Sequence, residues 1–383
     1  MADAVEPVIS DSADFIRASL MVGEPSQAHI QSIFGHAFLR MQCPSDRLDF
    51  CFSMESGNYE GFRDICVGHY PNRLAVVPTE DYLKIFLDEG RWVREYPLNL
   101  TLHEGQRLWQ LLDETSMAGD SPYHDYFHHG CSQEIMRFLT QCLDGQLVYG
   151  ERAKAYGNTI FTLGNQQLPR GSWVRMVPSM LSTTDGTDRI LSDAEKTMIP
   201  SIIPDLLSDA MVVEADGTQR SILRDASPVQ FLPSEPQVIG SAIPAYVWYL
   251  CGLLVVLVLS LLAFRWPLYG RLADGVLFVV YLAIVFVLLY VCAVSTLPTT
   301  SGWNWNYLIY NPLPLLLWLW GRFRALPWVR IYRFYALWIV IFLLAMTVVG
   351  GHLILEQYLL ATSFALRCLF KSFYPFQRAI VAN

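Results

Sequence analysis

The sequence predicts an α+β domain over residues 1–238, followed by an all-α membrane domain of about five transmembrane helices over residues 239–383. The first observation behind this prediction is the division of charge. Up to residue 238 the chain has 18 Lys and Arg against 33 Asp and Glu, whereas from residue 239 it has nine against two. The second is hydropathy, because 53% of the residues are hydrophobic and the long uncharged runs all lie after residue 238. The two regions therefore belong in different solvents.

Five apolar runs predict the membrane-spanning helices. They are residues 243–264, 275–297, 303–320, 334–351 and 352–370. The first two are each long enough to cross a hydrocarbon core of ~30 Å. The next two are shorter and carry Trp and Tyr near their ends, as interfacial anchors do. The fifth contains Glu356 and Arg367, so an amphipathic helix lying at the membrane interface is the alternative for that run.

The basic residues of this region indicate the topology. They form three groups: Arg265 and Arg271; Arg322, Arg324, Arg330 and Arg333; and Arg367, Lys371 and Arg378. Five spans place all three groups on one side, which the positive-inside rule identifies as the cytoplasm. The C-terminus is then cytoplasmic and the acidic N-terminal domain is extracytoplasmic. The chain opens Met-Ala-Asp-Ala-Val-Glu-Pro without an export signal, so we interpret residue 1 as a replacement start on a mature chain.

The segment around His36 predicts a β-hairpin, because Pro44-Ser45-Asp46 interrupts two stretches of period-2 alternation. The register that fits both stretches places His36 opposite Ser53, with Glu55 one diagonal step away. These residues share the more polar face of the hairpin. We therefore expect His36 to lie among polar groups.

Two helices follow in the same domain. Thr101 and Glu104 form a capping box that opens the first, and apolar residues at helical spacing predict a second that begins near Cys131. A cysteine at a helix N-terminus is placed where the helix dipole favours the thiolate. Beyond residue 150 the pattern suggests short strands near residues 158–163 and 172–177.

Several classes of function lack support in the sequence. There is no glycine-rich phosphate loop and no basic stripe, so we expect neither nucleotide nor nucleic acid as a partner. There is no Cys-x2-Cys, and His128 and His129 are adjacent instead of sharing a helical face, so we expect no metal and no other cofactor.

A thiol at a helix start with a histidine on a neighbouring strand is the papain-type arrangement, which makes Cys131 and His36 candidates for nucleophile and base. A structural cysteine and a structural histidine are the alternative interpretation. His124, His128 and His129 also lie close to Cys131 in the sequence and compete for the role of base.

Several motifs resemble those of Lnb-type bacterial lipoprotein N-acyltransferases. They are Ser32-Ile-Phe-Gly-His36-Ala-Phe-Leu-Arg40, Tyr96-Pro-Leu-Asn-Leu-Thr-Leu-His-Glu104, Tyr123-His-Asp-Tyr-Phe-His-His-Gly-Cys131-Ser132, and, in the membrane region, Trp303-Asn-Trp-Asn-Tyr307 with Asn311-Pro312. The resemblance implies a papain-like thiol fold that is permuted, with His36 as base ahead of the nucleophile Cys131. Ser53 and Glu55 are the candidates for orienting the imidazole. The family pattern favours Asn before the cysteine where this chain has Gly130, so we expect backbone N–H groups at the helix start to hold the oxyanion.

The resemblance further implies an N-acyltransferase at the outer face of the bacterial inner membrane, with the N-terminal domain in the periplasm. It would move an acyl chain from a membrane phospholipid, through a cysteine thioester, to the α-amino group of a diacylated lipoprotein. A membrane-anchored thiol hydrolase acting on a lipid ester or a peptidoglycan amide is the alternative, and a sensor with an inert thiol is a third. Trp303, Asn304 and Trp305 are candidates for bordering a substrate groove, or simply interfacial anchors.

Overall fold

The computed structural model describes residues 17–26, 32–56, 62–68, 70–119, 121–124, 128–169, 171–225, 227–232, 243–297, 299–321, 323–349 and 353–381. The chain start, where we expect a replaced first residue, lies outside these ranges. The chain divides into two compact units. The first consists of Met1–Asn158 and Ile190–Ile239, and the second of Thr159–Arg189 and Gly240–Asn383. One of these divisions falls after Ile239, and residues 159–189 belong to the helical unit.

The first unit is built on a seven-stranded sheet in the order β10-β5-β1-β2-β3-β4-β6. Its strands are β1 (Arg17–Gly23), β2 (His36–Cys43), β3 (Leu48–Ser56), β4 (Tyr70–Pro78), β5 (Val93–Pro97), β6 (Ser121–His124) and β10 (Val229–Leu232). All of the pairs between neighbouring strands are antiparallel. The central strands alternate buried residues toward both faces, as a sheet covered on both sides requires.

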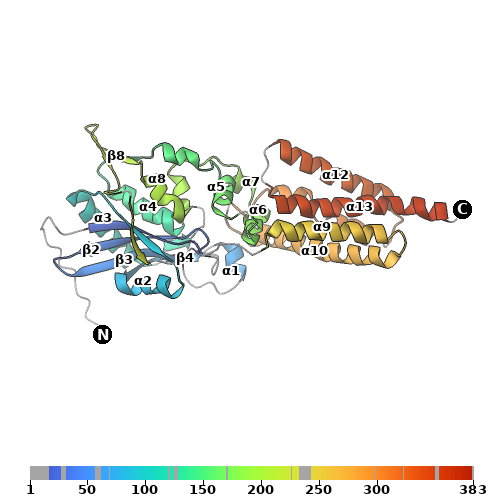
Figure 1. Ribbon diagram of the computed structural model, residues 1–383, viewed down its shortest axis with the longest axis horizontal. Helices are drawn as coiled ribbons and strands as arrows, with labels where there is room; N and C mark the ends of the chain where they lie inside the picture. The colour runs from blue at the N-terminus through green and yellow to red at the C-terminus, as the bar shows by residue number, and fades with distance from the viewer. Residues whose placement is uncertain are drawn as a thin grey trace. The chain divides into compact units, whose positions relative to one another are not determined.

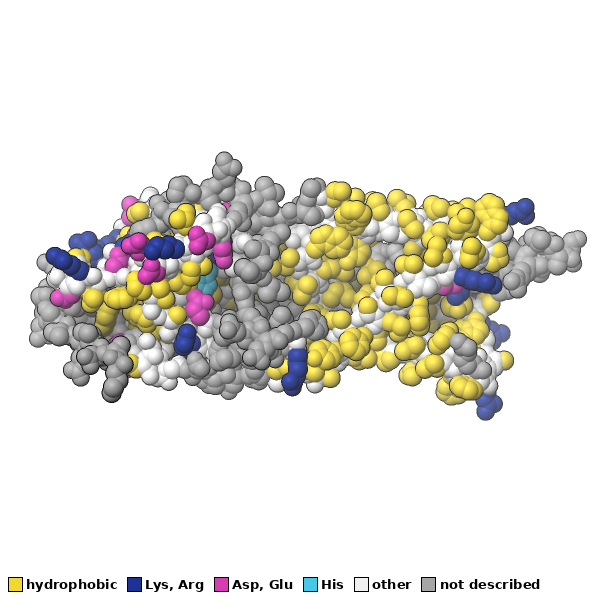
Figure 2. All heavy atoms as spheres, turned by 90° about the horizontal axis from the view of Figure 1, so that it is seen from below, with side chains coloured by type: hydrophobic (Ala, Val, Ile, Leu, Met, Phe, Trp, Pro, Cys, Tyr) yellow, Lys and Arg dark blue, Asp and Glu magenta, His cyan; other side chains and the backbone are white. Residues whose placement is uncertain are grey.

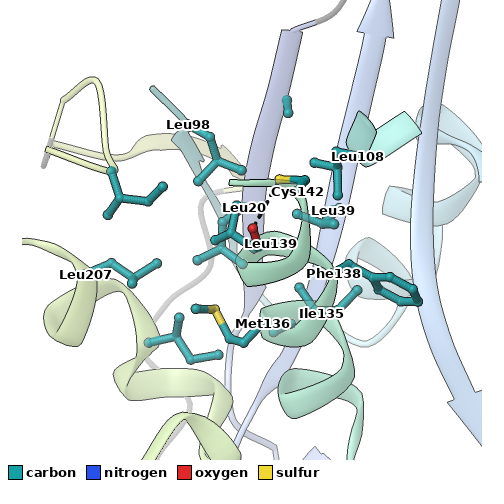
Figure 3. Packing of buried hydrophobic residues seen from close by; sticks show 14 of the residues in the cluster. Leu20, Leu39, Leu98, Leu108, Ile135, Met136, Phe138, Leu139, Cys142 and Leu207 are labelled. Carbon is teal, nitrogen blue, oxygen red and sulfur yellow. Dashed lines mark hydrogen bonds between the residues drawn. The ribbon is translucent and has the colours of Figure 1, made fainter. Parts of the chain in front are cut away.

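Helices cover both faces of this sheet (Figure 1). The helices α3 (Leu102–Ala118) and α4 (Cys131–Cys142) pack on one face, where Leu20 and Leu39 meet Ile135 and Leu139 in the main core (Figure 3). The helix α2 (Thr79–Asp88) packs on the opposite face through Tyr82 and Phe86. The sheet is therefore the middle layer of three, and side chains from both helical layers can reach its strand ends.

The β2–β3 hairpin forms as expected, but its register differs from the prediction. Leu39 pairs with Phe52 and Cys43 with Leu48, whereas the predicted register placed His36 opposite Ser53. The observed pairing is shifted by two residues because the loop closes one residue later, with Arg47 in the left-handed region at φ 57°. A shift of two keeps every side chain on its own face. His36, Ser53 and Glu55 therefore still share one face of the hairpin.

The two predicted helices of this unit are confirmed. Thr101 accepts from the Glu104 N–H and the Glu104 carboxylate accepts from the Thr101 N–H, which completes the capping box of α3. The remaining elements are α1 (Phe62–Val67), β7 (Gln146–Val148), η2 (Glu151–Ala155), η4 (Glu195–Met198), η5 (Pro200–Ile202), α8 (Ile203–Leu207), β8 (Met211–Val213) and β9 (Gln219–Ser221). The strands β7, β8 and β9 form a small sheet of their own.

The strands expected near residues 158–163 and 172–177 are wrong. These residues form the helices α5 (Ile160–Gln167), η3 (Trp173–Arg175) and α6 (Met176–Leu181), followed by α7 (Thr184–Thr187). Side-chain caps explain the difference. Thr159 accepts from the Thr162 N–H at the start of α5, and Ser172 accepts from the Val174 N–H at the start of η3. Local capping thus outweighs the β-propensity of the valine and isoleucine residues.

The second unit is a helical bundle. Its long helices are α9 (Ala245–Leu262), α10 (Pro267–Val294), α12 (Trp328–Val348) and α13 (Leu355–Val381), with η6 (Trp305–Leu308) and α11 (Leu313–Trp320) between them. Within the described part of the chain, α9, α10 and α12 are the three helices long and apolar enough to cross a membrane. On the face shown in Figure 2, hydrophobic side chains cover this unit and several Lys and Arg side chains lie at one end.

The run at residues 303–320 does not form the single transmembrane helix that we expected. Pro312 separates η6 from α11, whose eight residues span only about 12 Å. The non-helical chain between them is held by side chains of the long helices. Tyr281, near the middle of α10, hydrogen-bonds to the carbonyl oxygens of Ile309 and Asn311 at 3.2 and 2.7 Å, and Tyr335 of α12 also bonds to the Ile309 oxygen. These carbonyls are thus satisfied inside the bundle, as irregular chain at membrane depth requires.

Helix α13 packs along α9 and α12 (Figure 1). Arg367, the residue that weakened its prediction as a span, is 5% exposed and fully engaged inside the unit. Its guanidinium donates to the carboxylate of Asp274 at 2.8 Å and to the carbonyl oxygen of Gly270 at 2.9 Å. Lys371 binds the other oxygen of Asp274 at 3.1 Å. The charged residues therefore join α13 to α10 instead of placing it on the surface of the unit.

Candidate active site

His36 is the first residue of strand β2. Gly35 precedes it with φ +87°, and a side chain at Gly35 would lie 2.7 Å from the carbonyl oxygen of Gly23. Only glycine fits this close approach without strain. The imidazole of His36 is 17% exposed, and its Nε2 lies 2.7 Å from Ser53 Oγ. This contact leaves Nδ1 as the ring nitrogen that can face another partner.

Cys131 is the first residue of α4. Gly130 is the N-cap, and its N–H donates to the side-chain oxygen of Gln133, which fixes the turn into the helix. The side chain of Asn72 on β4 donates to the carbonyl oxygen of His129 at 3.3 Å and holds the same turn from the sheet. The sulfur is partly buried against the main core. The nucleophile candidate thus sits on a rigid helix start that is tied to the central sheet.

The structure brings Cys131 and His36 together as an interacting pair. Burial raises the pKa of the thiol, but the charge and hydrogen bond of His36, together with the backbone N–H of Ala37, lower it below the usual 9.0. Burial lowers the pKa of His36, but the Cys131 thiolate and then Glu55 raise it to about 9. Both shifts favour a thiolate–imidazolium pair near neutral pH. Such a pair provides a nucleophile and a proton donor in contact.

Behind the imidazole, Ser53 and Glu55 join it to a third residue that the sequence analysis missed. Ser53 Oγ donates to Glu55 Oε1 at 2.8 Å. The Tyr82 hydroxyl lies 2.6 Å from the same carboxylate oxygen, 2.8 Å from Ser53 Oγ and 3.2 Å from His36 Nε2. Tyr82 comes from α2, which packs on the other face of the sheet from α4. Its distance of 46 residues from His36 leaves no local signal in the sequence.

Among the competing groups near the site, His129 is engaged elsewhere and two other cysteines of the domain are held as thiols. His129 is 53% exposed and its Nδ1 lies 3.1 Å from Glu134 Oε1. Side-chain placement of His124 lies outside what the structure describes. All eight cysteines are free thiols, and burial raises the pKa of both Cys51 and Cys142 to about 12. In the part of the chain that the structure describes, no group of three His, Cys, Asp or Glu residues could hold a metal ion.

The expected groove residues lie in the helical unit. Trp303 is 51% exposed, whereas Asn304 is 2% exposed. The Asn304 amide donates to the Met180 carbonyl oxygen at 2.7 Å, and its oxygen accepts from the Asn306 N–H at 2.8 Å. Trp305 packs against the core of the bundle. Asn304 therefore fastens η6 to α6, and it does not present its amide to an open groove.

Residues 14–156 match the Lnb N-terminal periplasmic domain. The match covers both Cys131 and His36 and confirms the resemblance that the sequence motifs suggested. No curated protein and no solved structure matches the chain.

The residues that match the Lnb N-terminal periplasmic domain thus bring together a thiol, an imidazole and a carboxylate. The thiolate of Cys131 can attack a carbonyl carbon, and His36 can give its proton to the leaving group. The backbone N–H of Ala37 bonds to the sulfur, and Cys131 is the first residue of α4, so backbone donors are available for a developing oxyanion. The charge of Glu55 raises the pKa of the imidazole, and Ser53 and Tyr82 lie within hydrogen-bond distance of its Nε2.

Proposed function

We propose that this protein is an N-acyltransferase that moves an acyl chain from a membrane phospholipid to the α-amino group of a diacylated lipoprotein. The observation that carries the proposal is the Cys131–His36 pair inside the domain that matches the Lnb family. A thioester is reactive enough to acylate an amine, and both substrates reside in a membrane, which fits a thiol domain joined to apolar helices.

In the first half-reaction the Cys131 sulfur attacks the carbonyl carbon of the phospholipid ester. The new C–S bond forms as the bond from carbon to the glycerol oxygen breaks. The His36 imidazolium gives its proton to that oxygen, so a lysophospholipid leaves with a free hydroxyl. The products on the enzyme are a thioester and a neutral imidazole.

In the second half-reaction the neutral α-amine of the lipoprotein attacks the thioester carbon. A C–N bond forms, the C–S bond breaks, and His36 accepts the proton lost by the amine. The thiolate–imidazolium pair is thereby restored. Glu55 assists this step because its negative charge favours the protonated imidazole.

We further propose five membrane crossings in the bacterial inner membrane. Helices α9, α10, α12 and α13 are four of them, and η6 with α11 forms the remaining crossing as a broken segment. Support comes from Tyr281, which lies near the middle of α10 and hydrogen-bonds to the broken segment. Five crossings keep the three basic groups together in the cytoplasm and place the N-terminal domain in the periplasm.

Replacement of the nucleophile tests the mechanism. In vesicles that contain a phospholipid with a labelled acyl chain and a diacylated lipopeptide, the wild-type protein should form labelled N-acyl product. Cys131→Ala should abolish transfer while costing about 1 kcal/mol or less in stability, because the change removes one small group at a helix start. Mass spectrometry should find the acyl thioester on Cys131 when the lipopeptide is omitted. Full activity of Cys131→Ala would exclude the thioester route.

The same assay separates transfer from hydrolysis. A thiol hydrolase would release free fatty acid at the same rate whether or not the lipopeptide is present. The proposed transferase should instead divert the acyl chain to the lipopeptide amine and form little free acid.

A further inference from the structure

An apolar pocket lies inside the helical unit, between α6 and α10. It has a volume of about 280 Å³. Every side chain that lines it is hydrophobic: Met176, Val177, Met180 and Leu181 from α6, and Ala283, Ile284, Val287 and Leu288 from α10. Whole small-molecule sites are usually larger, at about 300–1,000 Å³, and carry a few polar groups. The pocket is therefore suited to a single hydrocarbon chain and not to a complete polar ligand.

The position of the pocket along α10 places it at the depth of one leaflet. Ala283 and Leu288 lie eleven and six residues before the end of α10 at Val294. At the helical rise this corresponds to roughly 9–17 Å from that end, about half of a hydrocarbon core. Neighbouring residues of α10 are exposed, with Phe286 at 66% and Leu289 at 47%. The pocket is thus continuous with a surface that a membrane would cover.

Polar and aromatic residues lie directly before α6 in the chain, next to the first residues that line the pocket. Trp173 is 46% exposed and lies near Tyr249 in the first turns of α9, with ring centroids 5.6 Å apart and the ring planes tilted by 45°. Trp and Tyr are the residues enriched at membrane interfaces. Arg175 directly precedes Met176, and its Nε donates to Asn165 at 3.1 Å. This bond holds a guanidinium, the group best suited to bind a phosphate, beside the start of the pocket. A diacylglyceryl lipoprotein has no phosphate, whereas a phospholipid does.

We propose that the α6–α10 pocket holds one acyl chain of a phospholipid from the outer leaflet, with Arg175 at its phosphate. This inference rests on the proposed acyl-transfer function and adds a donor site to it. Two side-chain amides support the arrangement, because Asn306 of η6 and Gln357 of α13 both donate to the Ser179 carbonyl oxygen of α6, at 3.1 and 3.0 Å. We call these two residues the clamp. The clamp fixes α6 to η6 and α13, and so holds the α6 wall of the pocket in place.

Photo-crosslinking tests the pocket without requiring catalysis. Full-length Cys131→Ala protein is placed in phosphatidylglycerol–phosphatidylethanolamine vesicles with a phosphatidylethanolamine that carries a diazirine in the middle of one acyl chain. We expect crosslinks to concentrate in residues 176–181 and 283–288. Ala283→Trp, at an exposed small residue of the lining, should fill the pocket and lower this labelling at least fivefold. Val279→Trp, one turn away, 65% exposed and outside the lining, is the matched control.

A second filling variant, Val177→Trp on the opposite wall, guards against an effect of Ala283→Trp on folding. Equal labelling of all exposed residues of α10, or equal labelling in Ala283→Trp and Val279→Trp, would overturn the proposal. A phosphate-free diacylglycerol with the same diazirine separates the two lipid sources. Efficient pocket labelling by that probe, or no loss of phospholipid labelling in Arg175→Gln, would overturn the assignment to a phospholipid.

The outcomes also separate this inference from the proposed function. Focused labelling, together with no acyl transfer by the wild-type protein, would leave the pocket standing and refute the transferase. Normal transfer with dispersed labelling would refute the pocket alone.

Discussion

Cys131 and Cys142 stand at opposite ends of the same helix, and their surroundings give them opposite chemistry. Cys142 is buried in the core and its Sγ donates to the Leu139 carbonyl oxygen, so its pKa rises to about 12 and it remains a thiol. Cys131 meets an imidazole and a backbone N–H, which lower its pKa. Reactivity in this domain is therefore decided by position on α4 and not by residue type.

Removal of the imidazole should show that the lowered pKa of Cys131 depends on His36. In His36→Ala the burial of Cys131 remains, whereas the charge and hydrogen bond that lower its pKa are lost. We expect the thiol pKa to rise, and the rate of Cys131 alkylation by iodoacetamide at pH 7 to fall by at least about tenfold. Peptide mass spectrometry over a pH series measures this rate for Cys131 alone. An unchanged pH midpoint would show that His36 does not stabilise the thiolate.

Glu55 should act through His36. Its charge raises the pKa of the imidazole, so Glu55→Gln should lower that pKa from about 9. Activity that requires protonated His36 is present below this pKa and lost as pH rises through it. The basic limb of the pH–rate profile should therefore move to lower pH in Glu55→Gln. Glu80→Gln, at an 87% exposed side chain on α2, is the control and should leave the profile in place.

At the scale of residues, the sequence predicts the placement of those site residues that belong to a recognisable local pattern. Cys131 was predicted from the start of a periodic helix, and His36, Ser53 and Glu55 from strand alternation, which survives a register shift of two. Tyr82 could not be predicted in the same way. It reaches His36 only because α2 folds over the sheet, and that contact depends on packing between Phe38, Tyr82 and Phe86.

At the scale of elements, the capping residues explain both the successes and the failures of prediction. Thr101 and Glu104 formed a recognisable pair at the start of α3, and the helix followed. Thr159 and Ser172 supply the same kind of cap, but the β-branched residues near them suggested strands. The hairpin register depended on where one loop closes, and Arg47 in a left-handed conformation is rare enough to be missed.

Glu104 should be more important to the fold than its role as a cap suggests. It is fully buried, accepts from the N–H groups of Thr101 and Asp144 at 2.8 and 3.0 Å, and pairs with Arg220. Glu104→Ala should cost about 3 kcal/mol, because it breaks a buried charged network. Thr101→Ala should cost only about 1 kcal/mol, because it removes a single cap. Hydrogen exchange of the α3 amides in the full chain measures both, and equal costs would contradict the network.

At the scale of the whole molecule, composition predicted two units but not the path of the chain between them. The change in charge at residue 238 lies next to one division, which falls after Ile239. Nothing in composition identifies residues 159–189 as part of the helical unit, because their attachment depends on side-chain clamps such as Asn304 to Met180. The break within residues 303–320 was hidden for a similar reason. Hydropathy measures apolarity along this run and does not register that Pro312 lacks a backbone N–H or that tyrosine hydroxyls bond to the carbonyl oxygens of Ile309 and Asn311.

The proposed topology is tested by reporter fusions. A green fluorescent protein fused after Asn383 should fluoresce, and an alkaline phosphatase fused there should be inactive, because both would lie in the cytoplasm. A phosphatase fused after Val294, at the end of α10, should be active as the control. An active phosphatase at the C-terminus would require an even number of crossings and would exclude the topology of five crossings.

The assignment of residues 159–189 to the helical unit also determines the order in which the protein can be assembled. The ribosome makes this segment before any of α9 to α13, while the strand β10 of the first unit comes after it. Neither unit is therefore complete when its first half emerges from the ribosome. The apolar residues of α6 have no packing partners until the chain is about a hundred residues longer. Biogenesis of this protein must keep that helix from aggregating in the interval, a demand that suits a holding chaperone on the side where the segment emerges.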